Sequence, residues 1–220
     1  MRKELILKKR VNFPSKVKIG GHLYSVLYPF IFRQREDALA QCHYSQCVIR
    51  VQDTSDNIMR SVPKIKSSFL HELLHIIDRV YNGNRINDLE NGEDIIIRLT
   101  SGLYQVVVDN NLYLHEPYKL PRIIKICGFK HKVIYPYDFK EDDNVYAMVC
   151  HQALELFVGR SDAVSDSYIK CEFIKLILNV LDIYYIISPK DLDILENMAE
   201  GIYQVFKDNN IPNIIKNSKE

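Results

Sequence analysis

The alternation of apolar and polar residues divides the chain into short strands and longer helices. Apolar residues recur at helical spacing over residues 63–81 and 92–110, where positions three and four apart would form one buried face. Ser61 is a suitable N-cap for the first segment, and Pro63 is acceptable in its first turn. Upstream, two short β-like runs flank a glycine turn, and a third covers Cys47 to Val51. The pattern therefore predicts a small sheet followed by two helices.

This pattern occurs twice along the chain. Residues 18–32 are similar to residues 125–139, since both begin with Lys-Ile, pass a glycine and reach a Tyr-Pro pair. Farther on, residues 102–111 return as residues 201–210, with a Gly, a Tyr-Gln-Val run and an Asp-Asn-Asn run at the same spacing. Self-similarity in the same order and spacing indicates a tandem duplication.

The duplication sets the expected organisation of the chain. We expect an α+β fold of two units, residues 1–115 and residues 116–220, each a small sheet followed by two helices. The Pro-containing stretch 115–121 is the natural linker between them. The second unit should pack against the first within the same chain, where it would cover apolar surface or present a substrate.

Three residues of the first predicted helix have a metal-binding pattern. His71 and His75 are four residues apart, so on a helix they stand on one face and can point two imidazole nitrogens at one ion. Glu72 is displaced by about 100° around the helix axis. It can therefore take a proton from water at the metal without binding the ion itself. The apolar residues around them predict a buried setting for this helix.

A zinc site with catalytic capacity needs a third protein ligand and one position open to water. We expect this ligand from the second predicted helix, because acidic residues stand at its beginning. Glu93 lies at the start, so its carboxylate is at the end of the helix that can face the histidines. Glu90 and Asp94 are alternatives that the sequence leaves open.

With these residues in place, the chain resembles a known family. The segment His71–Asp78, then Glu93 and the segment Gly102–Val106, are similar to the small zincin-like metallopeptidases common in phages and mobile elements. These are related in architecture to SprT-like and ImmA/IrrE-like proteins, and the resemblance covers most of residues 16–112. It implies the gluzincin set of zinc ligands, two histidines and a glutamate, which here are His71, His75 and Glu93.

The second unit lacks these residues. With the copies aligned on Phe69 and Phe173, the predicted base and both histidines are replaced. With the last helices aligned on Gly102 and Gly201, the predicted third ligand is also replaced. The replacements are Lys175 for His71, Leu176 for Glu72, Asn179 for His75 and Leu192 for Glu93. A lysine in a ligand position would repel a dication. We therefore expect one metal ion per chain, held by the first unit.

Residues that are the same in both copies are expected to stabilise the fold, because they are also present in the second copy, which lacks the predicted metal ligands. They are Asp78, Gly102, Tyr104, Gln105, Asp109 and Asn110. Asp78 follows His75 by almost one helical turn, so a role in orienting that imidazole stays open beside a structural one. For Tyr104 we expect core packing rather than a catalytic role.

Composition and charge argue against several other classes of protein. With 29 Lys plus Arg against 28 Asp plus Glu, the net charge of +1 gives no electrostatic case for nucleic acid. The N-terminal apolar run is too short for a secretion signal, and no apolar run is long enough to span a bilayer. Five cysteines without paired spacing suit a reducing compartment. We therefore expect a cytoplasmic protein that engages neither membrane nor nucleic acid.

The sequence predicts a zinc-dependent metallopeptidase that acts on a protein or peptide substrate. In this mechanism Glu72 accepts a proton as water attacks a peptide carbonyl, and then delivers the proton to the leaving amine. The alternative is a non-catalytic zinc-containing protein-interaction module. Glu72 separates the two, because a structural zinc site needs the histidines and has no use for a base between them.

Overall fold

Two four-stranded sheets, a two-stranded sheet and five α-helices occur in the residues that the computed structural model describes. These residues are 10–32, 38–56, 58–110, 112, 120–139, 145–160, 164–185 and 192–216. Strands and helices both contribute to the core, so the predicted α+β fold class is confirmed. The boundary expected between residues 115 and 116, and most of the expected linker, lie outside the described residues.

The first half begins with its sheet and continues into two long helices. Its elements are β1 (Lys16–Ile19), β2 (His22–Leu27), β3 (Ala40–His43), β4 (Val48–Val51), β5 (Thr54–Ser55), β6 (Ile58–Met59), α1 (Val62–Tyr81) and α2 (Gly92–Asp109). The helix bounds agree to within one residue with those predicted from apolar spacing. Ser61 occupies the N-cap position of α1, although its side chain makes no capping hydrogen bond, and Pro63 lies in the first turn.

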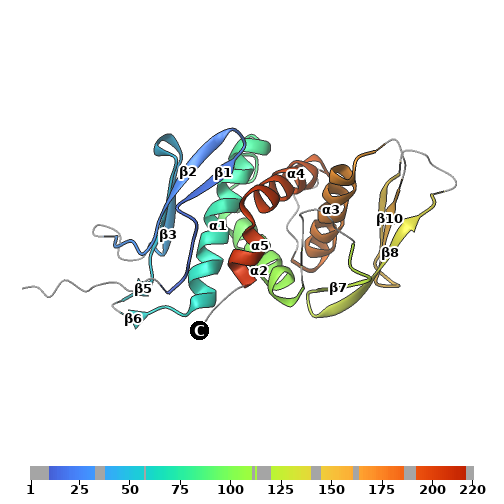
Figure 1. The fold of residues 1–220 in the computed structure, drawn as a ribbon, viewed down its shortest axis with the longest axis horizontal. Coiled ribbons are helices and arrows are strands. Elements are labelled where there is room, and N and C mark those ends of the chain that lie inside the picture. Colours follow the sequence, from blue (N-terminus) through green and yellow to red (C-terminus); the bar gives the residue numbers. More distant parts are fainter. Residues whose placement is uncertain are drawn as a thin grey trace, which may run out of the picture.

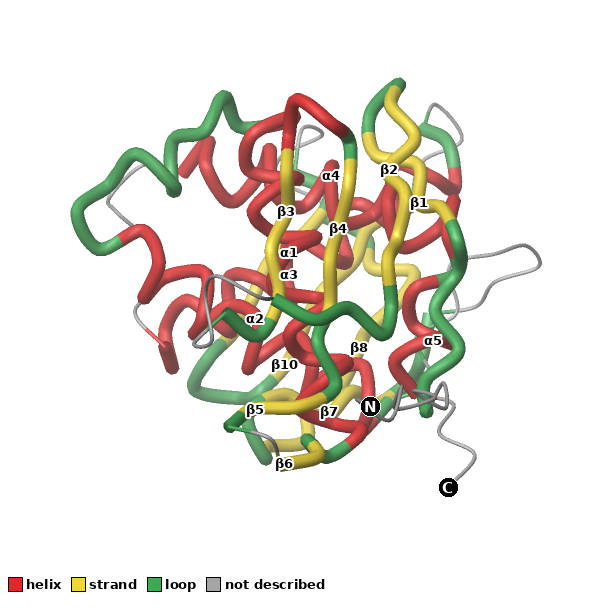
Figure 2. The backbone as a smooth tube through the Cα atoms, turned by 90° about the vertical axis from the view of Figure 1, so that its left-hand side faces the viewer, coloured by secondary structure: helices red, strands yellow, loops and turns green. Residues whose placement is uncertain are grey.

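The second half again has four sheet strands followed by two long helices. Its elements are β7 (Ile123–Ile126), β8 (Phe129–Tyr137), β9 (Ala147–Cys150), β10 (Glu155–Gly159), α3 (Asp166–Tyr185), α4 (Leu192–Asn209) and α5 (Ile211–Lys216). Among the described residues, β5 and β6 have no counterpart in this half, and the short helix α5 has none in the first half. The strand order is β1-β2-β4-β3 in one sheet and β7-β8-β10-β9 in the other. Each sheet contains an antiparallel hairpin, a central parallel pair and an antiparallel edge strand, β3 or β9. Figure 2 shows the strands of the first sheet side by side.

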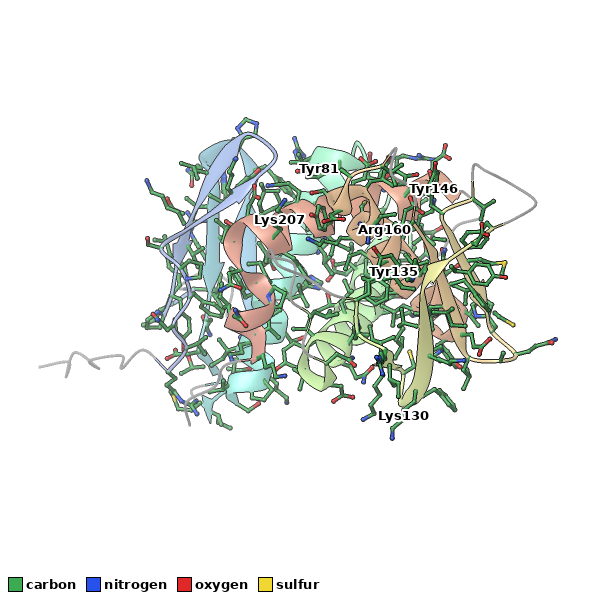
Figure 3. All side chains as sticks on the ribbon, turned by 45° about the vertical axis from the view of Figure 1, so that its right-hand side comes forward. Tyr81, Lys130, Tyr135, Tyr146, Arg160 and Lys207 are labelled. Atoms are coloured by element: carbon green, nitrogen blue, oxygen red, sulfur yellow. The ribbon has the colours of Figure 1, made fainter. Side chains whose placement is uncertain are left out.

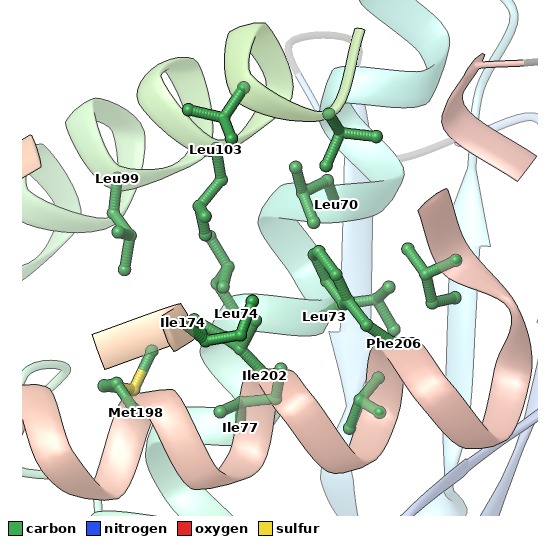
Figure 4. Packing of buried hydrophobic residues seen from close by; sticks show 14 of the residues in the cluster. Leu70, Leu73, Leu74, Ile77, Leu99, Leu103, Ile174, Met198, Ile202 and Phe206 are labelled. Carbon is green, nitrogen blue, oxygen red and sulfur yellow. The ribbon is translucent and has the colours of Figure 1, made fainter. Parts of the chain in front are cut away.

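The helices form a layer between the two sheets (Figure 1). Buried apolar side chains of both halves belong to one contiguous cluster. Within it Leu73 of α1 lies beside Phe206 of α4, and Ile77 of α1 lies beside Ile202 of α4 (Figure 4). Because a single core serves both halves, the helices of the second half help to bury the helix that carries the two predicted histidine ligands. None of the described helices is both long and apolar enough to cross a membrane.

The last long helix of each half packs against the first strand of the other half. α4 contacts α1 and β1, while α2 contacts α3 and β7. Gln204 of α4 accepts a hydrogen bond from the backbone N–H of Gly20 at 3.3 Å, and Gln105 of α2 accepts one from Cys127 at 2.9 Å. Tyr81, at the end of α1 and labelled in Figure 3, also donates to Gln204. We call these contacts of α4 with β1 and of α2 with β7 the crossed contacts.

The crossed contacts of α4 continue along its length. The backbone N–H of Lys18 donates to Oδ1 of Asn209 at 2.6 Å, and Nδ2 of Asn209 donates to the Lys18 carbonyl at 2.8 Å. Farther back on α4, a Cβ on Gly201 would lie 2.5 Å from Cγ2 of Ile77. The absence of a side chain at this position therefore lets α4 cross α1 at close range.

Candidate metal centre

His71 and His75 are brought together by one turn of α1. Their Nε2 atoms lie 2.9 Å apart, and their side chains are 18% and 15% exposed. Burial, followed by the neighbouring His75, lowers the pKa of His71 to about 4, so this imidazole is neutral at neutral pH. A neutral imidazole has the free lone pair that a metal ligand requires.

Glu93 faces the two histidines from the first turn of α2. Its Oε1 lies 3.2 Å from Nε2 of His71, and its Oε2 lies 3.2 Å from Nε2 of His75. The two other acidic residues considered, Glu90 and Asp94, are not part of this cluster. The Glu93 side chain is 63% exposed, so the site opens to solvent on this side.

Gly92 allows α2 to begin close enough to the site. A Cβ at this position would lie 2.0 Å from the backbone carbonyl oxygen of Ile86. Only glycine fits such an approach without movement of the backbone. The glycine before Glu93 therefore sets the distance between the start of α2 and the loop that follows α1.

The three side chains fit a divalent metal ion. Among the described residues, His71, His75 and Glu93 form the one group of three such side chains whose ligand atoms lie within 4.8 Å of one another. Ligands at zinc bond lengths of about 2.0–2.1 Å in a tetrahedron are about 3.3 Å apart, which is close to the spacings of 2.9 and 3.2 Å found here. Two nitrogens and one carboxylate oxygen are also a donor set that zinc accepts.

Glu72 lies beside this cluster and points to the edge strand of the sheet. Its Oε2 accepts a hydrogen bond from the backbone N–H of Cys42 in β3 at 2.6 Å. The residue is 7% exposed, and burial raises the pKa of its carboxyl group. The expectation that Glu72 stands apart from the ligands is consistent with this position.

A cavity of about 530 Å³ opens over the cluster. It is bounded by β3 and its flanking residues, by α1 and by α2. Its lining includes Leu39, Ala40, Gln41, Cys42 and Tyr44 on the strand side, Ser67, Ser68, His71, Glu72 and His75 on α1, and Glu93, Ile97, Thr100 and Ser101 on α2. The predicted base and the three predicted ligands thus share one cavity.

Among the described residues, two hydrogen-bonded contacts connect the strand wall of the cavity to α1. One is the bond between Glu72 and Cys42. The other is the buried Arg60, whose guanidinium donates to the backbone carbonyl of Leu39 at 3.1 Å and to the hydroxyl of Ser68. These bonds fix the distance between the edge strand and the helix that carries the histidines.

Two residues near the cluster connect His75 to the loop that follows α1. Asn87, in the loop between α1 and α2, has Oδ1 at 2.6 Å from Nδ1 of His75. Asp78 is fully buried and accepts the backbone N–H of Asn87 at 2.9 Å. No sequence pattern used above points to Asn87. The sequence leaves open a role for Asp78 in orienting His75, and the structure connects these two residues through Asn87.

The aligned position in the second half contains an ion pair. Lys175, which aligns with His71, donates to Glu196, and its Nζ lies 3.9 Å from a carboxylate oxygen of Glu172. An ammonium group thus occupies a place that aligns with a predicted metal ligand. The expectation that the metal site belongs to the first half stays a prediction.

Comparison of the chain with protein-family models, curated proteins and solved structures finds no match. The resemblance to zincin-like metallopeptidases therefore stays a prediction. It depends on the residues of α1 and α2 described above.

Proposed function

We propose that the chain is a zinc-dependent peptidase in which His71, His75 and Glu93 bind the metal and Glu72 is the general base. The observation that carries the proposal is the convergence of three ligand atoms and a separate buried carboxylate in one cavity. A purely structural site would account for the three ligands but not for Glu72. The choice of zinc follows the donor set and the resemblance of the motif to gluzincins.

The ligand residues would hold the ion while leaving one side accessible. A bound zinc ion would supply a Lewis acid that lowers the pKa of water and polarises a peptide carbonyl. The exposed side chain of Glu93 lies at the open side of the cluster, where water and substrate can enter. Both histidines come from one rigid helix turn, so their nitrogens need little rearrangement to bind.

Glu72 is suited to proton transfer by its surroundings. Burial raises the pKa of its carboxyl group, and a base whose pKa moves toward neutrality matches the task of taking a proton from water near neutral pH. The hydrogen bond from Cys42 holds one carboxylate oxygen in place. In the proposed reaction Glu72 takes a proton from the attacking water and transfers it to the amine that leaves.

The edge strand β3 offers a binding site for an extended peptide. In an antiparallel pair, successive residues point their backbone groups alternately toward the partner strand and away from it. The N–H of Cys42 points to α1 rather than β4, so the backbone groups of Ala40, two residues away, also face the cavity. A peptide can add to such an edge by main-chain hydrogen bonds. This favours a protein or peptide as the substrate.

The cytoplasm is the proposed place of action. All five cysteines are free thiols in the structure, as is usual in reducing compartments. Proteins or peptides of that compartment would then be the substrates.

Metal content and the Glu72→Gln variant together test the proposal. We expect one equivalent of zinc per chain, lost in the His71→Ala/His75→Ala double variant. Glu72→Gln should retain zinc and lower the cleavage of a fluorogenic peptide library by about 10²–10⁴-fold, the usual effect of a positioned acid–base group. Glu90→Gln, at an exposed acid outside the cluster, is the matched control. Equal turnover by Glu72→Gln and wild type would leave a zinc-containing interaction module as the better account.

A further inference from the structure

His75 is held on the side away from the cluster by a residue of the next loop. Its Nδ1 lies 2.6 Å from Oδ1 of Asn87, while its Nε2 faces His71 and Glu93. Histidines that bind metals generally donate their second ring N–H to such an acceptor, which fixes both the ring orientation and the tautomer. Asn87 is therefore in the position of an orienting partner for His75.

The other contacts of Asn87 determine which way its amide group faces. Its Nδ2 donates to the backbone carbonyl of His75 at 3.2 Å and to Oδ1 of Asn84 at 2.9 Å. The opposite orientation would place the amide oxygen against these two acceptors and lose both bonds. Oδ1 therefore faces His75, whose Nδ1 must carry the proton. The lone pair of Nε2 is then directed at the metal site.

Asp78 holds the loop in which Asn87 lies. Its fully buried carboxylate accepts the backbone N–H groups of Ile86 at 3.1 Å and Asn87 at 2.9 Å. It also accepts a hydrogen bond from Nδ2 of Asn82 at 2.8 Å. A buried carboxylate that receives several donors is a rigid anchor, because each lost bond would leave a buried polar group unpaired. Asp78 thus fixes the backbone from which Asn87 reaches His75.

The hydrogen-bonded chain continues into the second half of the protein. Nδ2 of Asn197, on α4, donates to Oδ1 of Asn82 at 3.3 Å. Asn82 is 3% exposed, so this oxygen is largely withdrawn from water. The same helix crosses α1 at Gly201, one turn farther along α4. α4 therefore contacts the start of the loop that orients His75.

We infer that Asn87 is a positioning residue for His75, that Asp78 fixes Asn87, and that α4 completes this support through Asn197. The inference rests on the metal site of the proposed function. It assigns a task to the second half, which contributes none of the three proposed ligands: this half helps to keep His75 in its binding orientation.

The tautomer of His75 in the metal-free protein tests the first link without any substitution. Long-range ¹H–¹⁵N NMR correlations distinguish an imidazole protonated at Nδ1 from one protonated at Nε2. We expect the Nδ1-protonated form to predominate in the wild-type protein. Predominance of the Nε2-protonated form would overturn the inference.

Two substitutions of Asn87 test its effect on metal binding. Asn87→Ala should weaken zinc binding by about 10–100-fold, the usual consequence of losing such a partner, as measured by competition with a chelator. Asn87→Asp keeps an oxygen for the Nδ1–H of His75, so its zinc affinity should stay within about threefold of wild type by the same argument. Wild-type affinity in Asn87→Ala, or equal losses in both variants, would contradict a positioning role.

Asn197→Ala tests the contribution of the second half to zinc binding, with Asn209→Ala as the matched control. Each variant removes an asparagine of α4 that bonds to the first half, but Asn209 contacts Lys18 and stands outside the chain to His75. We expect Asn197→Ala to lower zinc affinity about 2- to 10-fold, within the range seen for coupled residues without direct contact. Asn209→Ala should leave it unchanged. Equal zinc affinities in the two variants would contradict a contribution of the second half to the orientation of His75.

These measurements separate the inference from the proposed peptidase activity. They use zinc alone or the metal-free protein, so they need no substrate. A protein that binds zinc and has the expected His75 tautomer, but does not hydrolyse peptides, would support the inference and contradict the proposed reaction. Peptide hydrolysis by a protein whose His75 is protonated at Nε2 would support the proposed reaction and contradict the inference.

Discussion

Asn110, the residue after α2, pairs with the backbone of Lys125 in β7 through two hydrogen bonds. The N–H of Lys125 donates to Oδ1 of Asn110, and Nδ2 of Asn110 donates to the Lys125 carbonyl, each at 2.8 Å. The pair of bonds imitates a neighbouring strand at the edge of the second sheet. The side chain of Asn110 therefore satisfies a strand edge and fixes α2 against the other half.

Asn110→Ala should lower the free energy of unfolding by about 1–3 kcal/mol, because both bonds are lost and the strand edge loses its partner. Urea denaturation followed by circular dichroism measures the change. Asn213→Ala is the control, since its side chain bonds to Asn210 at an exposed position, and its effect should stay within about 0.5 kcal/mol. Wild-type stability in Asn110→Ala would mean that this contact does not hold the halves together.

Gly201→Ala should destabilise the protein although alanine favours helices. The added methyl group would meet Ile77 at 2.5 Å and the ring of Tyr81 at 2.8 Å. Overpacking of this kind costs about 1–3 kcal/mol and should exceed the gain in helix propensity of about 1 kcal/mol. Gly21→Ala is the control, because a methyl group there has no neighbour within 4 Å. A rise in the thermal midpoint of Gly201→Ala would contradict the close crossing of α4 and α1.

Gly92→Ala should affect metal binding. Its methyl group would overlap the Ile86 carbonyl oxygen at 2.0 Å, so the start of α2 must move and carry Glu93 with it. We expect zinc affinity to fall by about 10–100-fold, as for other changes that misplace a ligand without removing it. Isothermal titration calorimetry with zinc measures the loss. Zinc affinity equal to wild type would mean that Glu93 is not a ligand or that the loop containing Ile86 can move without displacing Glu93.

Cys171 should react slowly with alkylating reagents in the folded protein. Burial, followed by the carboxylates of Glu200 and Glu172, raises the pKa of its thiol to about 12. The reactive thiolate is therefore scarce at pH 8 and becomes abundant only as the pH approaches that pKa. Iodoacetamide labelling followed by mass spectrometry should give a much lower rate at Cys171 in native protein than in urea. Equal rates would contradict this environment.

The helices and the close approach of His71 to His75 were predictable because both depend on local spacing. Apolar residues at helical intervals gave the bounds of α1 and α2 almost to the residue. The interval between His71 and His75 determines that they share a face of any helix that contains them. The position of Glu93 near the histidines was predictable if the second helix starts beside them, because Glu93 lies in the first turn of that helix.

Other features depend on contacts that the sequence pattern does not specify. The edge strand β3 is partly buried along its length and lacks a clear alternation, so its role beside the cavity was not predicted. Asn87 belongs to no motif, and its function depends on the loop that Asp78 holds. The crossed contacts were also missed. Because both copies carry the same paired motifs, Gln105 could match either hairpin, and only three-dimensional packing decides between them.

The crossed packing has a consequence for synthesis on the ribosome. Ile77 of α1 packs against α4 at Gly201. This contact can form only after on the order of a hundred further residues have been synthesised. Until then the part of α1 that α4 covers faces solvent or a chaperone. The nascent first half should therefore stay sensitive to proteases while the second half is being made, and a pulse of protease on stalled chains would detect this. The proposed metal site would then mature near the end of translation, when α4 has been synthesised.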